Sequence, residues 1–274
     1  MRTAASSLDL LRPRSVDETL QLMSDDPSLI PLAGCTDLFV GLNAGTLPSQ
    51  RYVDLWGLDE LREIGVRNGA ISIGALATHT TIQESVPVMR TLPMLGAACR
   101  EIGGIQIQNR GTIGGNVANG SPAGDTLPVL AVAEAIVVLR STTGERRVPF
   151  TSFFSGYRKT VRRPNELIVA FEIPAVGEPQ WFRKVGTRAA QAISKVVMAA
   201  IGGGHPRIAI GSVAPTVIRC TRTEAALANG ASLDEAVRVL EEEVQPIDDI
   251  RSTATYRRRV CGNLFRRFAT DTAR

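Results

Sequence analysis

The sequence predicts an α+β protein that contains two or three small domains. The chain has 274 residues, more than one compact hydrophobic core usually serves. Segments with apolar residues three or four positions apart, the helical period, are mixed with short β-branched runs bounded by turn residues. In the last third of the chain the strand-like runs come first and the helix-like runs follow, an order that favours a sheet backed by helices.

The first third predicts a helix and then a strand–helix–strand unit. Ser15 and Glu18 have the spacing of a capping box at the start of the helix. One face of that helix is apolar and consists of Val16, Leu20 and Met23. The runs 29–34 and 51–55 then read as strands, separated by a loop and a second helix-like stretch.

The middle third predicts two hairpins with helices between them. Asn68–Gly69 joins two alternating runs in the first hairpin, and the turn 142–144 joins two in the second. Thr81 and Glu84 repeat the capping-box spacing at the start of a short helix, and the following helix is expected to end at Gly103–Gly104. The run 165–174 reads as a strand.

The C-terminal third predicts a three-stranded sheet with helices. Residues 175–180 are expected to be a linker, because a glycine and the prolines at 174 and 179 interrupt any period. Strand-like runs follow at 181–188, 192–203 and 207–214, and helix-like runs at 221–230, 232–244 and 256–268. In the last of these, apolar residues recur every fourth position and should form the buried face, opposite the arginines: Tyr256, Val260, Leu264 and Phe268.

The composition excludes several classes of protein. Hydrophobic residues at 44% and charged residues at 21% are typical of soluble globular chains, and the net charge of +4 is only mildly basic. The segment 256–268 comes nearest to the mixture of basic and aromatic residues that binds nucleic acids, but its apolar period predicts one buried helix face with the arginines on the solvated or partner-facing side. The N-terminus lacks the apolar core of a secretory signal, and the longest apolar run, 127–139, is too short to span a bilayer. We therefore expect a cytoplasmic protein.

We predict neither a metal site nor a catalytic residue. The four cysteines are far apart and form no CxxC pair, so they are expected to be reduced, packed thiols. His79 and His205 are expected to be structural, and two histidines allow no convincing Ser–His–Asp set. Cys35 is expected to be present for its size.

Two polar, glycine-rich segments are candidates for a ligand site, namely AGCTD at 33–37 and GTIGGN at 111–116. Glycines let successive backbone N–H groups approach a phosphate, and Thr36 and Thr112 add hydroxyl donors. Asp37 and Asp125 would be repelled by phosphate but could accept hydrogen bonds from sugar hydroxyls. The pattern favours a nucleotide with a ribose or ribityl chain, although glycine-rich stretches are also common in ordinary loops.

Several longer motifs resemble the FAD-binding medium subunit of the molybdenum hydroxylases, the xanthine dehydrogenase and carbon monoxide dehydrogenase family. They are PLAGCTDL, IGALATHTTI, IQIQNRGTIGGNVANGSPAGD, FFSGYRKT, NELIVAFEIP and YRRRVCGNLFRR, and they extend over nearly the whole chain. The resemblance implies a two-subdomain FAD-binding fold of the vanillyl-alcohol-oxidase (PCMH) type and a C-terminal α+β domain. The expected domains are residues 1–56, 57–175 and 176–274.

The resemblance also implies FAD as the cofactor and assigns residues to it. The first loop, expected to grip the FAD diphosphate, consists of Leu32, Ala33, Gly34, Cys35, Thr36, Asp37 and Leu38. The second loop, with the same expected role, contains Thr112, Gly114, Gly115, Asn116 and Asn119. Asp125 resembles the acid that bonds FAD hydroxyls, and the remaining expected contacts lie near the ring system: Leu167, Ile168, Lys184, Ile102 and Gly103.

Two positions depart from the family pattern. Cys35 replaces the second glycine of the usual AGGTD motif, at a strain of about 1 kcal/mol if the position needs a positive φ. Ile102 stands where some relatives carry an aromatic residue, which argues against flavin stacking from that position.

The implied role is electron transfer within a larger enzyme. In the family, a large subunit oxidises the substrate at a molybdenum cofactor, and electrons cross iron–sulfur clusters of a small subunit to this FAD. We expect both partner subunits, as a dimer of heterotrimers, and no nucleic-acid partner. A purine or other N-heterocycle is the first substrate hypothesis, with carbon monoxide or an aldehyde as alternatives. The electron acceptor (NAD, quinone, ferredoxin or oxygen) stays open.

Two rival functions are a self-contained flavin oxidase and a nucleotide-binding regulatory module.

Overall fold

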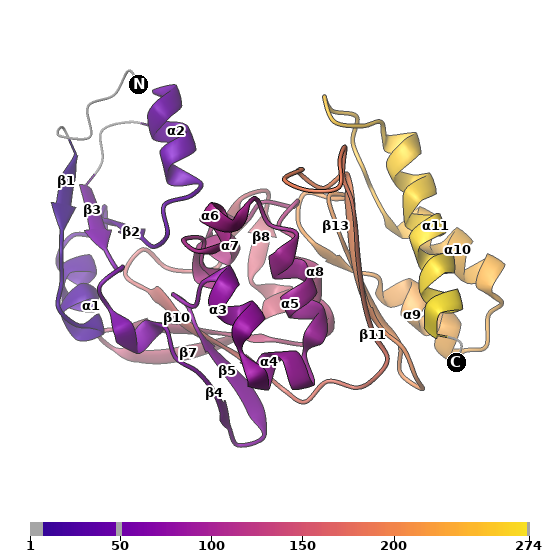
Figure 1. The fold of residues 1–274 in the computed structure, drawn as a ribbon, viewed down its shortest axis with the longest axis horizontal. Helices are drawn as coiled ribbons and strands as arrows, with labels where there is room; N and C mark the ends of the chain where they lie inside the picture. Colours follow the sequence, from indigo (N-terminus) through magenta and orange to yellow (C-terminus); the bar gives the residue numbers. More distant parts are fainter. Residues whose placement is uncertain (1–7, 48–50, 273–274) are drawn as a thin grey trace.

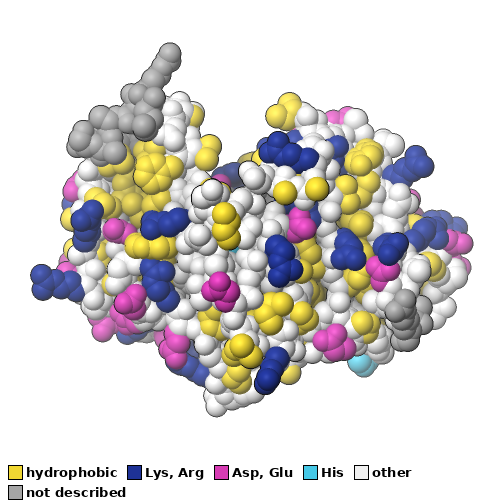
Figure 2. Space-filling view, in the orientation of Figure 1, with side chains coloured by type: hydrophobic (Ala, Val, Ile, Leu, Met, Phe, Trp, Pro, Cys, Tyr) yellow, Lys and Arg dark blue, Asp and Glu magenta, His cyan; other side chains and the backbone are white. Residues whose placement is uncertain are grey.

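The computed structural model describes residues 8–47 and 51–272 and arranges them as three successive units, each built on its own sheet (Figure 1). The expected α+β class is confirmed, because each sheet is accompanied by helices. The space-filling view shows a hollow in the upper edge of the molecule, between the first and third units (Figure 2). Within the described residues, none of the helices combines the length and hydropathy needed to traverse a bilayer.

The first unit is a small parallel sheet with strand order β1-β3-β2. Its elements are β1 (Asp9–Leu11), α1 (Val16–Asp25), β2 (Ile30–Leu32), α2 (Leu38–Ala44) and β3 (Arg51–Asp54). The predicted strand–helix–strand unit is confirmed as β2–α2–β3, and β1 is a strand that the sequence did not predict. Only half of the expected capping box forms, because Glu18 accepts a hydrogen bond from the backbone of Arg14 and not from that of Ser15.

The second unit is a five-stranded antiparallel sheet with order β4-β5-β10-β6-β7. Its strands are β4 (Ile64–Arg67), β5 (Ala70–Gly74), β6 (Ile136–Ser141), β7 (Gly144–Pro149) and β10 (Leu167–Ile173). Both predicted hairpins are confirmed, and Asn68 and Gly69 have the positive φ values (52° and 79°) that a tight hairpin turn needs.

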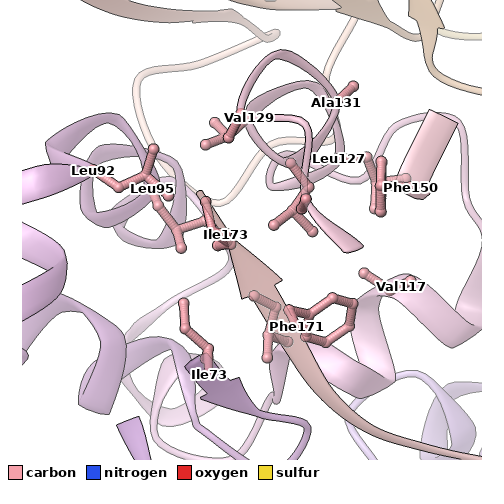
Figure 3. Close-up of a cluster of buried hydrophobic side chains, with 14 of the residues drawn as sticks. Ile73, Leu92, Leu95, Val117, Leu127, Val129, Ala131, Phe150, Phe171 and Ile173 are labelled. Carbon is pink, nitrogen blue, oxygen red and sulfur yellow. The ribbon is translucent and has the colours of Figure 1, made fainter. Parts of the chain in front are cut away.

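Short helices pack on one face of this sheet. They are α3 (His79–Glu84), α4 (Val86–Thr91), α5 (Pro93–Arg100), α6 (Ile105–Gln108), α7 (Ile113–Asn119) and α8 (Leu127–Val132). Figure 3 shows Ile73 and Phe171 of the sheet facing Leu95 and Leu127 of the helices in a buried cluster. The cap expected at Thr81 is wrong, since α3 begins after Thr78, whose hydroxyl accepts from the Thr81 amide.

Four small elements complete the second unit. The strands β8 (Phe154–Gly156) and β9 (Lys159–Thr160) pair with each other, and the short helices are η2 (Asp59–Leu61) and η3 (Phe150–Ser152). The β8–β9 turn contains Tyr157 and Arg158, and Arg158 has a positive φ of 52°. This turn lies at the cleft described below.

The third unit is a sheet with order β11-β12-β13-β14. Its elements are β11 (Gln180–Val185), β12 (Val196–Ile201), β13 (Arg207–Gly211), β14 (Ile218–Arg219), α9 (Thr221–Ala228), α10 (Leu233–Glu243) and α11 (Ala254–Thr272). The sheet therefore has one strand more than predicted, because the two-residue β14 is too short to give a sequence period. All residues of β12 are buried, since one face packs on the second unit and the other on the C-terminal helices.

The buried face of α11 differs from the predicted one. Arg257, Cys261, Phe265 and Phe268 are buried, whereas Tyr256 is 42% exposed. The predicted Phe268 is part of this face, and Arg257 joins it because its guanidinium donates to the Ser212 carbonyl and to the half-buried carboxylate of Asp249. A fourfold apolar period does not reveal an arginine whose charge is compensated in the interior.

Candidate functional site

All of the predicted site residues line one cleft, of about 1430 Å³, between the three units. The first unit contributes the segment after β2, the second contributes α6, α7 and the start of β10, and the third contributes β11 and the segments near β12 and α11. The lining residues that the sequence predicted are Leu32, Ala33, Gly34, Cys35, Thr36, Asp37, Leu38, Ile102, Gly103, Thr112, Gly114, Gly115, Asn116, Asn119, Asp125, Leu167, Ile168 and Lys184.

The loop between β2 and α2 offers unused backbone donors to this cleft. Among the residues that the structure describes, the N–H groups of Gly34 to Leu38 have no hydrogen-bond acceptor. The chain turns here through Cys35, whose φ is +63°. Successive free N–H groups in a turn form a concave, partly positive surface that suits an anion.

The second glycine-rich segment is largely a helix and not the loop that was expected. Thr112 caps α7 by accepting from the Gly115 amide at 3.1 Å, and Gly120, with φ of +59°, ends the helix. The amides of Ile113 and Gly114 donate to backbone carbonyls of Ala77 and Ala75. The first turn of α7 therefore has few free donors, because capping and packing have consumed them.

Glycine is required at position 34, where the two segments meet. A Cβ on Gly34 would lie 1.7 Å from the carbonyl oxygen of Arg110, and a Cβ on Gly115 would lie 3.0 Å from the Thr112 hydroxyl. Any side chain at position 34 would push the first loop away from the second segment. The sequence signal of two separated glycine-rich stretches is thus explained by close backbone approach.

A polar bridge crosses the cleft at its first-unit end. The Asn119 side-chain amide donates to Asp37 at 3.0 Å and accepts from Arg158 at 2.8 Å. Asn116 accepts from the hydroxyl of Thr126 at 2.6 Å, which orients its amide. Arg158 belongs to the motif FFSGYRKT, but it was not assigned to the site from sequence, because the motif does not show that this turn reaches the cleft.

The other end of the cleft contains a buried ion pair. Lys184 Nζ lies 2.6 Å from Asp125 Oδ2 and donates to the Glu101 carbonyl at 2.9 Å. Ser194 Oγ donates to the other carboxylate oxygen of Asp125. Burial raises the pKa of Asp125, and the charge of Lys184 opposes this shift. Asp125 was expected to be a free acceptor, but both oxygens already accept from the protein and each retains only its second lone pair.

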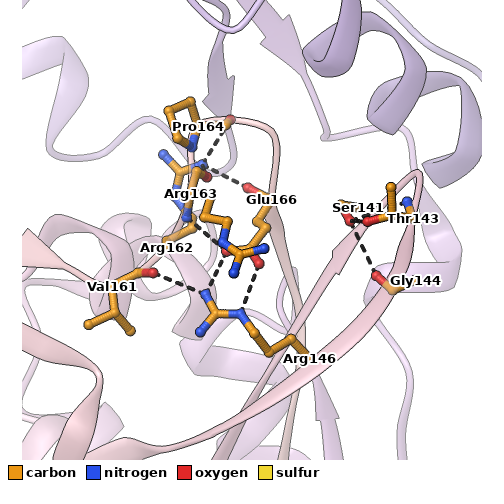
Figure 4. Close-up of polar contacts among 9 residues, drawn as sticks. All are labelled: Ser141, Thr143, Gly144, Arg146, Val161, Arg162, Arg163, Pro164 and Glu166. Carbon is orange, nitrogen blue, oxygen red and sulfur yellow. Dashed lines mark hydrogen bonds and ion pairs between the residues drawn. The ribbon is translucent and has the colours of Figure 1, made fainter.

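The apolar wall at Leu167 and Ile168 is held in place by an arginine–glutamate cluster (Figure 4). Arg146 donates to both oxygens of Glu166, at 2.9 and 2.7 Å, and the backbone N–H of Arg163 also donates to Glu166. Arg162 donates to the Glu166 carbonyl at 2.7 Å. This cluster fixes the chain immediately before β10, so that Leu167 and Ile168 line the cleft.

His79, expected to be structural, is also part of the cleft wall. It is 2% exposed, and its backbone N–H donates to the Gly111 carbonyl at 3.0 Å. Burial lowers the pKa of His79 to about 4, so the ring is neutral at physiological pH. Its Nδ1 has no hydrogen-bond partner among the described residues.

Comparison with known protein families identifies two matching regions. A model described as the FAD-binding domain in molybdopterin dehydrogenase matches residues 6–176, and one described as the CO dehydrogenase flavoprotein C-terminal domain matches residues 181–272. The interval between the matches falls within the predicted linker. The domain boundaries expected at 56/57 and 175/176 stay predictions.

Individual proteins resemble the chain over most of its length. The carbon monoxide dehydrogenase medium chain of Hydrogenophaga pseudoflava is 32% identical over 271 residues, 93% of each chain. The xanthine dehydrogenase FAD-binding subunit of Escherichia coli O157:H7 is 31% identical over 258 residues, 90% of this chain and 87% of that one. Among solved structures, quinoline 2-oxidoreductase from Pseudomonas putida 86 superposes with a TM-score of 0.92 at 26% identity, covering 100% of this chain and 98% of the other.

We predict that Cys35→Gly stabilises the protein. A non-glycine residue at positive φ is strained by about 1–2 kcal/mol, and glycine removes this strain. Glycine also increases the conformational entropy of the unfolded chain, which offsets part of the gain. The free energy of unfolding, measured by denaturant titration, should rise by up to about 1 kcal/mol. Cys35→Ala retains the strain and should not stabilise; equal gains in both variants would contradict the prediction.

We also predict a pH dependence of stability caused by His79. Its pKa falls from 6.5 in the unfolded chain to about 4 in the folded one, so the unfolded state binds more protons in this window. The free energy of unfolding should therefore decrease as the pH is lowered through it, by roughly 3 kcal/mol in total. His79→Gln should remove this component and His205→Gln should not; an unchanged pH profile in His79→Gln would exclude His79 as its source.

Proposed function

The chain belongs to the family of FAD-binding subunits of the molybdenum hydroxylases, oxidoreductases in which this subunit carries FAD, and we propose that it conducts electrons from an iron–sulfur partner subunit through FAD to an external acceptor. The observation that supports this proposal best is the cleft, where free backbone donors at one end and a buried lysine–carboxylate pair at the other are joined by an apolar wall.

The residues present fit FAD along this cleft. The free N–H groups of the first loop suit the diphosphate, which carries negative charge and many acceptor oxygens. The hydroxyl of Thr112 accepts from the Gly115 amide and can still donate its own hydrogen to a ligand. Gly114 and Gly115 have no side chains that would occupy the space beside it. In this assignment Asn116 and Asn119 are held in orientation by Thr126 and Arg158.

The other end of the cleft suits the ribityl chain and the flavin ring. The remaining lone pairs of Asp125 can accept from ribityl hydroxyls. Leu167 and Ile168 supply apolar surface for the ring, Lys184 supplies a positive charge, and Ile102 and Gly103 flank it. FAD, when bound, supplies the ability to take electrons singly and to release them singly or as a hydride. The protein's part is to bind, orient and charge-balance, so we assign no catalytic acid or base.

We propose two partner chains, an iron–sulfur small subunit and a molybdopterin-binding large subunit, assembled as a dimer of heterotrimers. Support comes from the relatives, which are named as a medium chain and as an FAD-binding subunit. A purine or other N-heterocycle is the proposed substrate of the complex, in line with the names xanthine dehydrogenase and quinoline 2-oxidoreductase. Carbon monoxide, as in the name of another relative, is the alternative.

The test of this function is the visible spectrum of the chain purified with its native partners. We expect released FAD and bleaching of the bound flavin when hypoxanthine or quinoline is added anaerobically. Bleaching by carbon monoxide or an aldehyde alone would keep electron transfer but change the substrate. A lone chain with full substrate turnover would point to a self-contained oxidase, and a colourless preparation that reconstitution with FAD does not change would refute the proposal.

The residue assignment is tested by two variants at opposite ends of the cleft. Gly115→Val places a branched side chain between Thr112 and Ala33 and should lower the FAD content of the purified chain severalfold. Asp125→Ala removes a hydroxyl acceptor and leaves Lys184 without its counter-charge, a loss of about 3–5 kcal/mol for a buried pair. It should therefore lower both FAD content and stability.

Matched controls separate cofactor binding from folding. Gly57→Val changes a glycine with no neighbour within 4 Å, and Asp59→Ala removes a side chain that is 94% exposed. Both should retain the wild-type FAD content. The double variant Asp125→Ala/Lys184→Met removes both charges, so it should regain stability but not FAD. A full flavin complement in Gly115→Val and Asp125→Ala would refute the assignment while leaving family membership intact.

A further inference from the structure

A buried polar network runs from α11 to the cleft. Arg257 donates to the Ser212 carbonyl at 2.7 Å, Ser212 donates to the Ser194 carbonyl at 3.0 Å, and Ser194 donates to Asp125. All four residues are buried. The side chains of Ser212, Ser194 and Asp125 are hydrogen-bonded, which restricts their arrangement, whereas Arg257 Nε has no partner among the described residues. Ser194 is the member that touches the ion pair, and its side chain is directed at the carboxylate and not at solvent.

The Asp125 carboxylate is clamped on both oxygens. Oδ2 accepts from Lys184 at 2.6 Å, and Oδ1 accepts from Ser194, which is 1% exposed. The ammonium group of Lys184 has three donors, of which Asp125 and the Glu101 carbonyl occupy two. Because Lys184 lines the cleft, the third donor is left for a ligand there.

We propose that Ser194 is a positioning residue that, by holding the Asp125 carboxylate, keeps the charge of Lys184 compensated and so sets the electrostatic field at the flavin end of the cleft. The inference rests on the proposed function, because the field acts on FAD only if FAD occupies this cleft. Ser194 lies in the segment before β12 in the third unit. It would act on the cofactor indirectly, through Asp125 and Lys184.

The direction of its effect follows from the charges. Burial already raises the pKa of Asp125, while Lys184 and the hydrogen bond from Ser194 oppose the shift. Loss of that hydrogen bond raises the pKa of Asp125 further. A protonated Asp125 leaves Lys184 uncompensated, and a positive charge beside the cleft favours the electron-rich, reduced form of a bound redox ligand.

Few other titratable groups face Asp125. Among the described residues, Glu101 and Cys99, at the C-terminal end of α5, are the groups besides Lys184 whose charges couple to it. Burial raises the pKa of Cys99 far above its ordinary range, so this thiol stays neutral. Glu101 disfavours the ionised Asp125 with or without Ser194, and therefore does not distinguish the variants.

The test compares assembled wild-type complex with Ser194→Ala and with Ser141→Ala, a control at the last residue of β6. The oxidised-to-reduced ratio of bound FAD is measured anaerobically against a dye of known potential. We expect Ser194→Ala to retain FAD and to lower this ratio at pH values where Asp125 is protonated in the variant only, by about tenfold, equivalent to about 30 mV for a two-electron couple. The difference should shrink at alkaline pH, where Asp125 is ionised in both proteins, and Ser141→Ala should match the wild type.

A double-mutant cycle tests whether Ser194 acts through Asp125. In complex reconstituted with FAD, Ser194→Ala should cause no further change when Asp125→Asn is already present. An equal change in both backgrounds would overturn the proposal, as would a wild-type ratio in Ser194→Ala or loss of FAD from that variant when it is folded and assembled. If Ser194→Ala fails to assemble, Ser194→Cys replaces it, because the thiol is similar in size to the hydroxyl but a weaker donor. This variant should also lower the oxidised-to-reduced ratio of FAD, and a wild-type ratio in it would refute the proposal.

The outcomes separate this inference from the proposed function. If the wild-type complex contains reducible FAD and Ser194→Ala has the wild-type oxidised-to-reduced ratio, only the positioning role of Ser194 is refuted. If the wild-type complex contains no FAD, both the positioning role and the proposed function are refuted.

Discussion

The burial of β12 on both faces is the packing constraint on which the site depends. Val197, Ala199 and Ile201 pack into the core of the second unit, while Val196 and Met198 pack against the C-terminal helices. A one-residue shift in the register of this strand would exchange the two sets of side chains between the two cores, where their sizes do not match the space available. The third unit is therefore fixed against the second, and with it the positions of Lys184 on the neighbouring strand β11 and of Ser194 just before β12.

The two ends of the cleft solve different electrostatic problems. At the first-unit end, partial positive charge comes from backbone N–H groups that the fold leaves without acceptors, so no lysine or arginine is needed in the loop. At the third-unit end, a full positive charge is buried and must be balanced, which Asp125 does at 2.6 Å. The first-unit end therefore suits an anionic group, and the third-unit end suits a group whose charge changes.

Competition for backbone donors explains why the two glycine-rich segments differ. In α7 the donors are consumed by the Thr112 cap and by contacts with Ala75 and Ala77, so this segment serves mainly as a rigid wall. In the first loop the turn at Cys35 prevents a helix from starting until Leu38, and the donors stay free. The same residue type therefore serves close packing at Gly114 and Gly115 and a ligand-facing turn at 34–35.

The sequence by itself determined the local elements and the family. Asn68–Gly69 specifies a hairpin because both residues tolerate positive φ, and the helical period of Val16, Leu20 and Met23 specifies a buried face, since both signals lie within a few residues. Part of the cleft lining was likewise predictable, most of it from motifs that are contiguous in the chain. Only the tertiary structure decided the partners of Asp125, the burial of Arg257, the strand β14 and the inclusion of Arg158 and Ser194. Lys184 and Ser194 lie 59 and 69 residues from Asp125 in sequence. Partners so far apart are chosen by how the sheets pack, and no local period or motif records that choice.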